Sequence, residues 1–247
     1  MWDKTEDSLS VTIPEEKAVT TKQGILSFLA AIYDPLGVLS PVTLVEKYLF
    51  RDCCDTKLSW DNSVTGELLK RWQAFVKDLP RSVSFPRALV LQREELSFVD
   101  LHVFADASKI STGAVTYAVI HQPSGVSQGI VAAKSRISKK ATIPRLELIG
   151  GVMAANLLKN VRNVLSGIDG GVRVRKEVCW SDSTTVIHWV RGDPTRMKLF
   201  VRNHCNKILE NTSKALWRHV PGVQNPADIA SRGATVSALG EDWWKGP

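Results

Sequence analysis

The sequence predicts an α/β fold in which one mixed five-stranded sheet is flanked by helices and preceded by a small α-helical module. Apolar residues recur at three- and four-residue spacing in the first part of the chain and alternate as in strands from Phe98 onward. From there the order is three strands, a helix, a strand, one or two helices, a strand and a helix, which suits right-handed crossovers in one sheet. The net charge is −2 over residues 1–98 and +9 over residues 99–247. The two parts therefore differ in charge as well as in periodicity.

The amino-terminal part, residues 1–96, has the pattern of a helical module. Its first 18 residues are polar and contain Pro14, which is typical of a tail or of the end of a longer segment. Three helices are then expected: from residues 20–23 to a stop at Asp34-Pro35, from Pro41 to Leu49, and from Asn62-Ser63 to Val76.

Residues 97–236 have the pattern of the mixed sheet. Three strands are expected at 99–105, 113–121 and 129–134, with a hairpin turn at Pro123-Ser124-Gly125. A long helix begins at Pro144 and reaches about Leu165, a fourth strand covers 172–180, and a helix follows Ser183. A helix at 198–209, a strand at 215–220 and a short helix from Asn225-Pro226 complete the order.

Four acidic residues stand where strands end or helices begin. Asp106 ends an apolar strand, where an ionised carboxylate loses hydration unless a cation or hydrogen-bond donors replace the water. Asp182 directly follows the fourth strand, at an edge where open α/β sheets place ligand sites. Glu147 and Asp228 lie in first helical turns, and Glu147 heads a stripe of small or apolar residues that would pack on the sheet. Each acid alone has an ordinary explanation as a strand end, a helix cap or a complement to the helix dipole.

Together the four acids indicate a metal site. Side chains at strand ends and helix starts of one sheet can converge, whereas four independent caps have no reason to occur in so basic a part of the chain. Carboxylates without a histidine or cysteine pattern nearby select hard cations, so we expect Mg²⁺ or Mn²⁺. Two such ions about 3.5–4 Å apart activate a water and stabilise the leaving oxygen of a phosphodiester. The predicted catalytic and metal-binding residues are therefore Asp106, Glu147, Asp182 and Asp228.

Four motifs, carrying acids in the order D, E, D, D, resemble those of retroelement ribonucleases H. They are Phe104-Ala105-Asp106-Ala107-Ser108, Arg145-Leu146-Glu147-Leu148, Trp180-Ser181-Asp182-Ser183 and Asn225-Pro226-Ala227-Asp228-Ile229-Ala230-Ser231-Arg232. Residues 24–29, Tyr33-Asp34-Pro35-Leu36-Gly37 and 39–41 resemble the segment that joins reverse transcriptase to ribonuclease H in BEL/Pao retrotransposon polyproteins, a region also named Pao retrotransposon peptidase. Residues 243–247 resemble the segment leading toward an integrase, so the resemblance covers essentially the whole chain.

The resemblance implies a ribonuclease H-like fold at 97–236, preceded by a reverse transcriptase end and a thumb or connection module at 1–96 and followed by a linker at 237–247. It implies a two-metal endonuclease that hydrolyses the RNA strand of RNA–DNA hybrids. Its partners would be the reverse transcriptase and integrase parts of the same polyprotein, in a cytoplasmic virus-like particle or in the nucleus. Residues 221–224 lack the histidine that cellular relatives carry in this loop, and we expect His219 to be structural.

Two groups of basic residues are candidates for binding the substrate. They are Lys134, Arg136, Lys139, Lys140 and Arg145 in the connection leading to Glu147, and Arg191, Arg196, Lys198 and Arg202 around a helix start. Both would contact phosphates, so that preference for a hybrid comes from groove shape and the RNA 2′-hydroxyl. A solvated basic loop is the alternative for the first group. Trp180, Trp189 and Trp217 are expected in the core.

Other functions fit parts of the pattern. A catalytically silent or domesticated module of the same fold would bind nucleic acid or a polymerase partner without cutting. An integrase or transposase is disfavoured because its acids run D, D, E, and an aspartic peptidase because the chain has no Asp-Thr-Gly or Asp-Ser-Gly turn. Neither a secretory signal nor an apolar run long enough for a membrane span is present. The four cysteines lack zinc-site spacing and are expected to be reduced core thiols.

Overall fold

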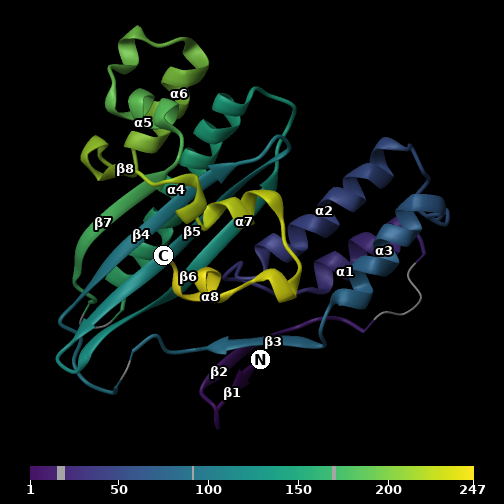
Figure 1. The fold of residues 1–247 in the computed structure, drawn as a ribbon, viewed down its shortest axis with the longest axis horizontal. Helices are drawn as coiled ribbons and strands as arrows, with labels where there is room; N and C mark the ends of the chain where they lie inside the picture. The colour runs from purple at the N-terminus through teal and green to yellow at the C-terminus, as the bar shows by residue number, and fades with distance from the viewer. Residues whose placement is uncertain (16–19, 91, 169–170) are drawn as a thin grey trace.

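A mixed five-stranded sheet is the centre of the computed structural model, which describes residues 1–15, 20–90, 92–168 and 171–247 (Figure 1). Its strand order is β6-β5-β4-β7-β8, with β4–β5 and β5–β6 antiparallel and β4–β7 and β7–β8 parallel. The strands are β4 (Phe98–Ala107), β5 (Ser111–Gln122), β6 (Gly125–Ile137), β7 (Val174–Ser181) and β8 (Trp217–His219). The predicted sheet is thus confirmed, although the last strand is shorter than expected because Lys214–Leu216 form a 3-10 turn.

Helices cover both faces of this sheet. One face carries α4 (Ile143–Ser166), α5 (Thr184–Arg191) and α6 (Leu199–Leu209), with a 3-10 turn at Pro194–Arg196. The other face carries the short helices α7 (Ala227–Arg232) and α8 (Glu241–Lys245), with 3-10 turns at Gly222–Gln224 and Val236–Ala238. Alternation along β4 divides its side chains between the two cores: Val103 and Ala105 pack on the α4 side, and Phe104 packs on the α7 side.

The amino-terminal module contains the three expected helices, α1 (Lys22–Ala31), α2 (Ser40–Asp55) and α3 (Gly66–Asp78). The expectation of a tail at residues 1–18 is wrong for the residues that the structure describes. Strands β1 (Trp2–Asp3), β2 (Ser8–Thr12) and β3 (Ser82–Pro86) form a second, antiparallel sheet. Val11 on β2 and Ile13 just after it are buried against the helices. The strand was missed because its pairing partner lies far along the chain.

The helical module packs directly on the five-stranded sheet (Figure 1). The loop before α2 covers edge strand β6, since Leu36 O accepts a hydrogen bond from Ala133 N at 2.8 Å. Gly37 has a φ of +71°, and a Cβ there would lie 1.9 Å from Ala133 O, so only glycine allows this approach. Segment 237–247, predicted as a linker, includes α8, whose fully buried Trp243 donates to Val38 O at 3.0 Å. The two parts of the chain therefore share one continuous core.

Two further features agree with the sequence. Cys53, Cys179 and Cys205 are buried, Cys54 is partly buried, and all four are free thiols, as expected. Across the described ranges, no helix is long and apolar enough to cross a membrane.

Candidate active site

Asp106 lies near the end of β4 and points toward α7. Only 8% of the residue is exposed, and one carboxylate oxygen accepts a hydrogen bond from the Ser231 hydroxyl. Burial raises the pKa of Asp106 to about 6, the Ser231 hydrogen bond opposes this rise, and the charges of Asp182 and Asp228 add to it. The structure therefore brings three of the four predicted acids close enough to affect one another.

Asn225 joins the strand that carries Asp106 to Asp182. Its amide nitrogen donates to Ala105 O at 3.1 Å and to Asp182 Oδ1 at 3.3 Å, while its amide oxygen accepts from Ala227 N at 3.1 Å. Asn225 is buried, so these bonds are shielded from water. The sequence placed Asn225 only at the start of the last short helix, whereas in the structure it also connects the strand of Asp106 with Asp182.

Asp228 lies in the first turn of α7 and pairs with Arg232 at its end. Arg232 Nε donates to Asp228 Oδ1 at 2.5 Å. This hydrogen bond and the charge of Asp228 raise the pKa of Arg232, with smaller contributions from Asp106 and Asp182. The positive charge of the Arg232 guanidinium therefore partly neutralises three carboxylates, those of Asp228, Asp106 and Asp182.

Glu147 contacts the start of α5 and lies in the second turn of α4, not in the first as expected, because α4 begins at Ile143. Its Oε2 accepts from Ser183 Oγ at 2.6 Å, and the same hydroxyl caps α5 by accepting from Val186 N at 3.2 Å. Ser183 is therefore the N-cap of α5, so capping does not account for Asp182 or Ser181. The bond between Glu147 and Ser183 also places Glu147 beside the residue that follows Asp182.

Two glycines permit the close approach of the helices that carry Glu147 and Asp228. A Cβ at Gly150 would lie 2.9 Å from Asp106 O, so α4 passes directly over the backbone of the buried acid. A Cβ at Gly113, which pairs with Asp106 across β4 and β5, would lie 2.6 Å from Ala230 C and Ser231 N of α7. Neither glycine was singled out in the sequence, although a glycine inside a strand is a known sign of close backbone approach.

The donor chemistry of the site fits a hard cation, but the side chains are not arranged around one. Every one of the four carboxylates has a protein partner: Ser231 for Asp106, Ser183 for Glu147, Asn225 for Asp182 and Arg232 for Asp228. Within the described part of the chain, no group of three or more His, Cys, Asp or Glu residues is placed to hold one metal ion. A carboxylate has two oxygens with about four acceptor sites in all, so a cation can bind beside these partners or in place of them.

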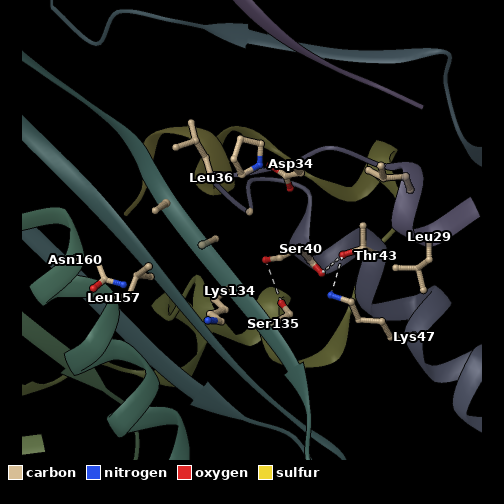
Figure 2. A pocket seen from close by; sticks show the side chains of 15 residues that line it. Leu29, Asp34, Leu36, Ser40, Thr43, Lys47, Lys134, Ser135, Leu157 and Asn160 are labelled. Carbon is tan, nitrogen blue, oxygen red and sulfur yellow. Dashed lines mark hydrogen bonds between the residues drawn. The ribbon is translucent and has the colours of Figure 1, made fainter. Parts of the chain in front are cut away.

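The first basic group is spread over β6, the loop before α4 and the start of α4. Lys134 and Arg136 flank Ser135 on β6, and Ser135 pairs with Gly113, so both lie two strands from Asp106. Lys134 lines a cavity of about 440 Å³ between β6 and α2, where Lys47 extends from the other wall (Figure 2). Lys139 and Lys140 are exposed in the loop before α4. Arg145 lies over the Phe200 ring, 4.9 Å from its centroid, and joins α4 to α6.

Two residues of the second basic group line a groove between α5 and α6. Arg196 and Lys198 line this groove of about 690 Å³ together with His188 and Trp189. Arg196 is exposed and lies 3.7 Å from Asp193. Arg191, by contrast, donates to Trp217 O at 2.5 Å and so helps to fix β8, and Arg202 lies farther along α6.

The aromatic residues and His219 occupy three kinds of position. Trp217 is fully buried, as expected, and Trp180 is partly buried and stacks on Phe104. Trp189 is only partly buried and lines the groove between α5 and α6. His219 pairs with Ser181 next to Asp182 and is exposed, and its ring makes no hydrogen bond to any residue that the structure describes. Its expected structural role stays a prediction.

Comparison with known proteins identifies the family. The model of the "Pao retrotransposon-like RNaseH-like domain" matches residues 21–183, which include Asp106, Glu147 and Asp182 but not Asp228. No curated protein matches the chain.

Several solved structures are similar to parts of the chain. The N-terminal RNase H domain of rv2228c from Mycobacterium tuberculosis is 16% identical, covers 54% of this chain and 91% of its own, and has a TM-score of 0.37. LC11-RNase H1 in complex with RNA/DNA hybrid is 16% identical, with coverages of 57% and 99% and a TM-score of 0.37. The foamy viral protease-reverse transcriptase in complex with RNA/DNA hybrid is 15% identical, with coverages of 92% and 28% and a TM-score of 0.47. These scores are too low to carry the assignment.

The assignment rests instead on the family match, which spans more than half of the chain, and on the order of the five strands. The matched residues run from the first helix of the amino-terminal module to the acid that follows β7. The chain therefore belongs to the family of Pao retrotransposon-like RNaseH-like domains and has a ribonuclease H-like fold.

Proposed function

We propose that this chain is a metal-dependent endonuclease that hydrolyses the RNA strand of RNA–DNA hybrids, as part of a retrotransposon polyprotein. The observation that carries the proposal is geometric: Asp106 and Asp182 follow the paired strand residues Ala105 and Ser181, and Asn225 donates to Ala105 O and to Asp182. Helix α7, which carries Asp228, meets them there through the bond from Ser231 to Asp106. Placing several carboxylates together is unfavourable without a cation, and such an arrangement is typical of a functional site.

The four acids are the proposed ligands, and their placement assigns separate tasks to the surrounding residues. Bound Mg²⁺ or Mn²⁺, in two ions, would supply an activated water and positive charge at the leaving oxygen. Asp106 is fixed by the strand and by Ser231, and Asn225 holds Asp182 against that strand. Arg232 neutralises Asp228 in the metal-free protein and can turn outward on loading, because its side chain is largely exposed.

The groove between α5 and α6 is the proposed contact for the substrate backbone. Arg196 and Lys198 are exposed cations suited to phosphates, and Trp189 offers a partly exposed ring beside them. Lys139 and Lys140 are exposed in the loop that precedes α4, and in this proposal they contact a strand bound beside Glu147. Such contacts position the duplex without reading its sequence, so selection of a hybrid depends on groove shape and on the RNA 2′-hydroxyl.

Cleavage of strand-labelled duplexes tests this proposal. The full chain is incubated with an RNA–DNA hybrid, double-stranded DNA and double-stranded RNA, each with Mg²⁺, Mn²⁺ or chelator. We expect cutting of the RNA strand of the hybrid alone, and only with a divalent cation. Tight binding of the hybrid without cutting in either metal would replace the proposal by the catalytically silent binding module.

The polyprotein setting is part of the same proposal. The reverse transcriptase and integrase parts of one polyprotein are the proposed partners, and a cytoplasmic virus-like particle or the nucleus is the proposed location. Mass spectrometry of purified particles tests both: peptides of this chain should occur together with peptides of the polymerase, and their absence would oppose the assignment.

A further inference from the structure

A cluster of four hydroxyl groups connects the helical module with the candidate active site. Tyr48 on α2 donates to Ser111 Oγ on β5 at 2.5 Å, and Ser108 and Ser111 share a hydrogen bond of 2.8 Å. Ser111 in turn donates to Ser231 O in the last turn of α7, and the Ser231 hydroxyl donates to Asp106. We call Tyr48, Ser108, Ser111 and Ser231 the hydroxyl cluster.

The direction of the hydrogen bonds follows from the number of protons. Ser111 has one proton, and because it donates to Ser231 O it must accept from Tyr48 and Ser108. The Tyr48 hydroxyl therefore donates its single proton mainly to Ser111 Oγ. Ser231 O, at 3.4 Å, is a weaker second acceptor. Ser111 and Ser231 are fully buried, so water does not replace a missing partner.

The cluster satisfies the carboxyl-terminal end of a very short helix. The last carbonyl groups of any helix lack partners within it, and α7 has only six residues. The Ser111 hydroxyl donates to Ser231 O, and the Ser135 hydroxyl of β6 donates to Ala230 O at 2.6 Å. Helix α7 is thus positioned by hydroxyl groups from outside, and it carries both Asp228 and the serine that holds Asp106.

The helical module contacts the same place a second time. Ala234 N donates to Pro41 O at 3.3 Å, just after Gly233, the C-cap of α7. Gly233 has a φ of +84°, and a Cβ there would lie 3.0 Å from Val45 Cγ2. One helix of the module, α2, therefore contacts the end of α7 and the residue that binds it, through Pro41, Val45 and Tyr48.

We propose that Tyr48 is a positioning residue: through Ser111 it fixes α7 and thereby the relative placement of Asp106 and Asp228. The helical module is then a working part of the nuclease rather than a spacer before it. The effect of Tyr48 on catalysis rests on the proposed function, whereas its effect on the position of α7 does not. Tyr48 does not touch the substrate in this proposal and acts only through α7.

Hydrogen exchange of the metal-free full chain tests the structural part. In Tyr48→Phe, amides of residues 227–234 should exchange roughly three- to tenfold faster, the amount expected for loss of one buried hydrogen bond. Amides of α5 should exchange as in the wild type. Tyr33→Phe is the matched control, because the Tyr33 side chain is exposed and removing its hydroxyl should change neither segment. Unchanged exchange at 227–234 in Tyr48→Phe, with the variant folded, overturns the proposal.

A second variant and a titration with Mg²⁺ distinguish the positioning of α7 by Tyr48 from a general destabilisation of the fold. Ser111→Ala should speed exchange at 227–234 as Tyr48→Phe does, and the double variant should add little, because both break one chain of bonds. Fully additive effects overturn the proposal. If the wild type cleaves hybrid, Tyr48→Phe should need several-fold more Mg²⁺ for half-maximal rate at an unchanged KM for hybrid. A wild type that does not cleave contradicts the proposed function, and the exchange result still decides the role of Tyr48.

Discussion

Replacing Gly113 with alanine tests how closely α7 must approach the sheet. A Cβ at this position would lie 2.6 Å from two backbone atoms of α7, Ala230 C and Ser231 N. An ordinary contact is about 3.4 Å, so α7 must move by about 0.8 Å, which exceeds the roughly 0.5 Å within which a catalytic constellation must be held. Overpacking of this kind costs about 1–3 kcal/mol, and the melting temperature should fall by roughly 2–12 °C.

The catalytic loss in Gly113→Ala should be larger than the loss of stability. A misplacement near 1 Å lowers rates by about 100-fold, because Asp228 and Ser231 move with α7 relative to Asp106. Thermal unfolding followed by circular dichroism and single-turnover cleavage of labelled hybrid measure the two effects. Gly240→Ala is the matched control, since no atom lies within 4 Å of a Cβ there and its backbone is compatible with alanine. A Gly113→Ala protein with wild-type stability and cleavage would refute the reasoning.

Four further predictions concern charge. Burial raises the pKa of Asp106 from 3.8 to about 6, so the folded chain keeps a proton that the unfolded chain has lost, and stability falls as pH rises from about 4 to 6. This fall in the free energy of unfolding should reach up to about 3 kcal/mol at pH 7, and urea unfolding of Asp106→Asn should not show it. The same substitution should abolish cleavage. Burial raises the pKa of Glu46 from 4.5 to about 8, and its two carboxylate oxygens have no hydrogen-bond partner among the residues that the structure describes. Its contribution to stability is present below pH 4.5 and lost as pH rises through 8, so Glu46→Gln should reduce the fall of the melting temperature between about pH 4.5 and 8. Changing Arg196 and Lys198 together to Gln should weaken hybrid binding and make the slope of log K against log salt shallower by about one to two, whereas an unchanged slope would exclude phosphate contacts. His219→Ala should lower turnover by less than about tenfold, because a general acid or base contributes about 10²–10⁴ and a loss of that size would show that His219 takes part.

The elements of the sheet were predicted from the sequence more fully than the surroundings of the four acids. Alternating apolar residues locate β4, and the prolines at 41 and 144 locate helix starts, because these signals are local. Strand β2 was not predicted, since its partner β3 is supplied by a distant segment. Its five residues alone are too few to distinguish a strand from a polar tail.

Other parts of the site depend on contacts between segments that are far apart in the chain. Gly113 meets α7 and Gly150 meets Asp106 only after the sheet and helices have packed, so neither position has a local signal beyond the glycine itself. The bond from Tyr48 to Ser111 likewise joins the helical module to the sheet. The first basic group was predicted from spacing along the chain, but strand β6 carries Lys134 two strands away from Asp106.

Cleavage of a labelled RNA–DNA hybrid by the wild type and by Asp106→Asn, in Mg²⁺, tests most directly whether the acids form a catalytic metal site. Asparagine preserves the shape of the side chain and an oxygen that can accept from Ser231, so the fold should survive and hybrid binding should persist. We predict that the wild type cuts only the RNA strand and that Asp106→Asn does not cut it, although it still binds the hybrid. Equal cutting by both proteins, or binding without any cutting by a folded wild type, would contradict the assignment.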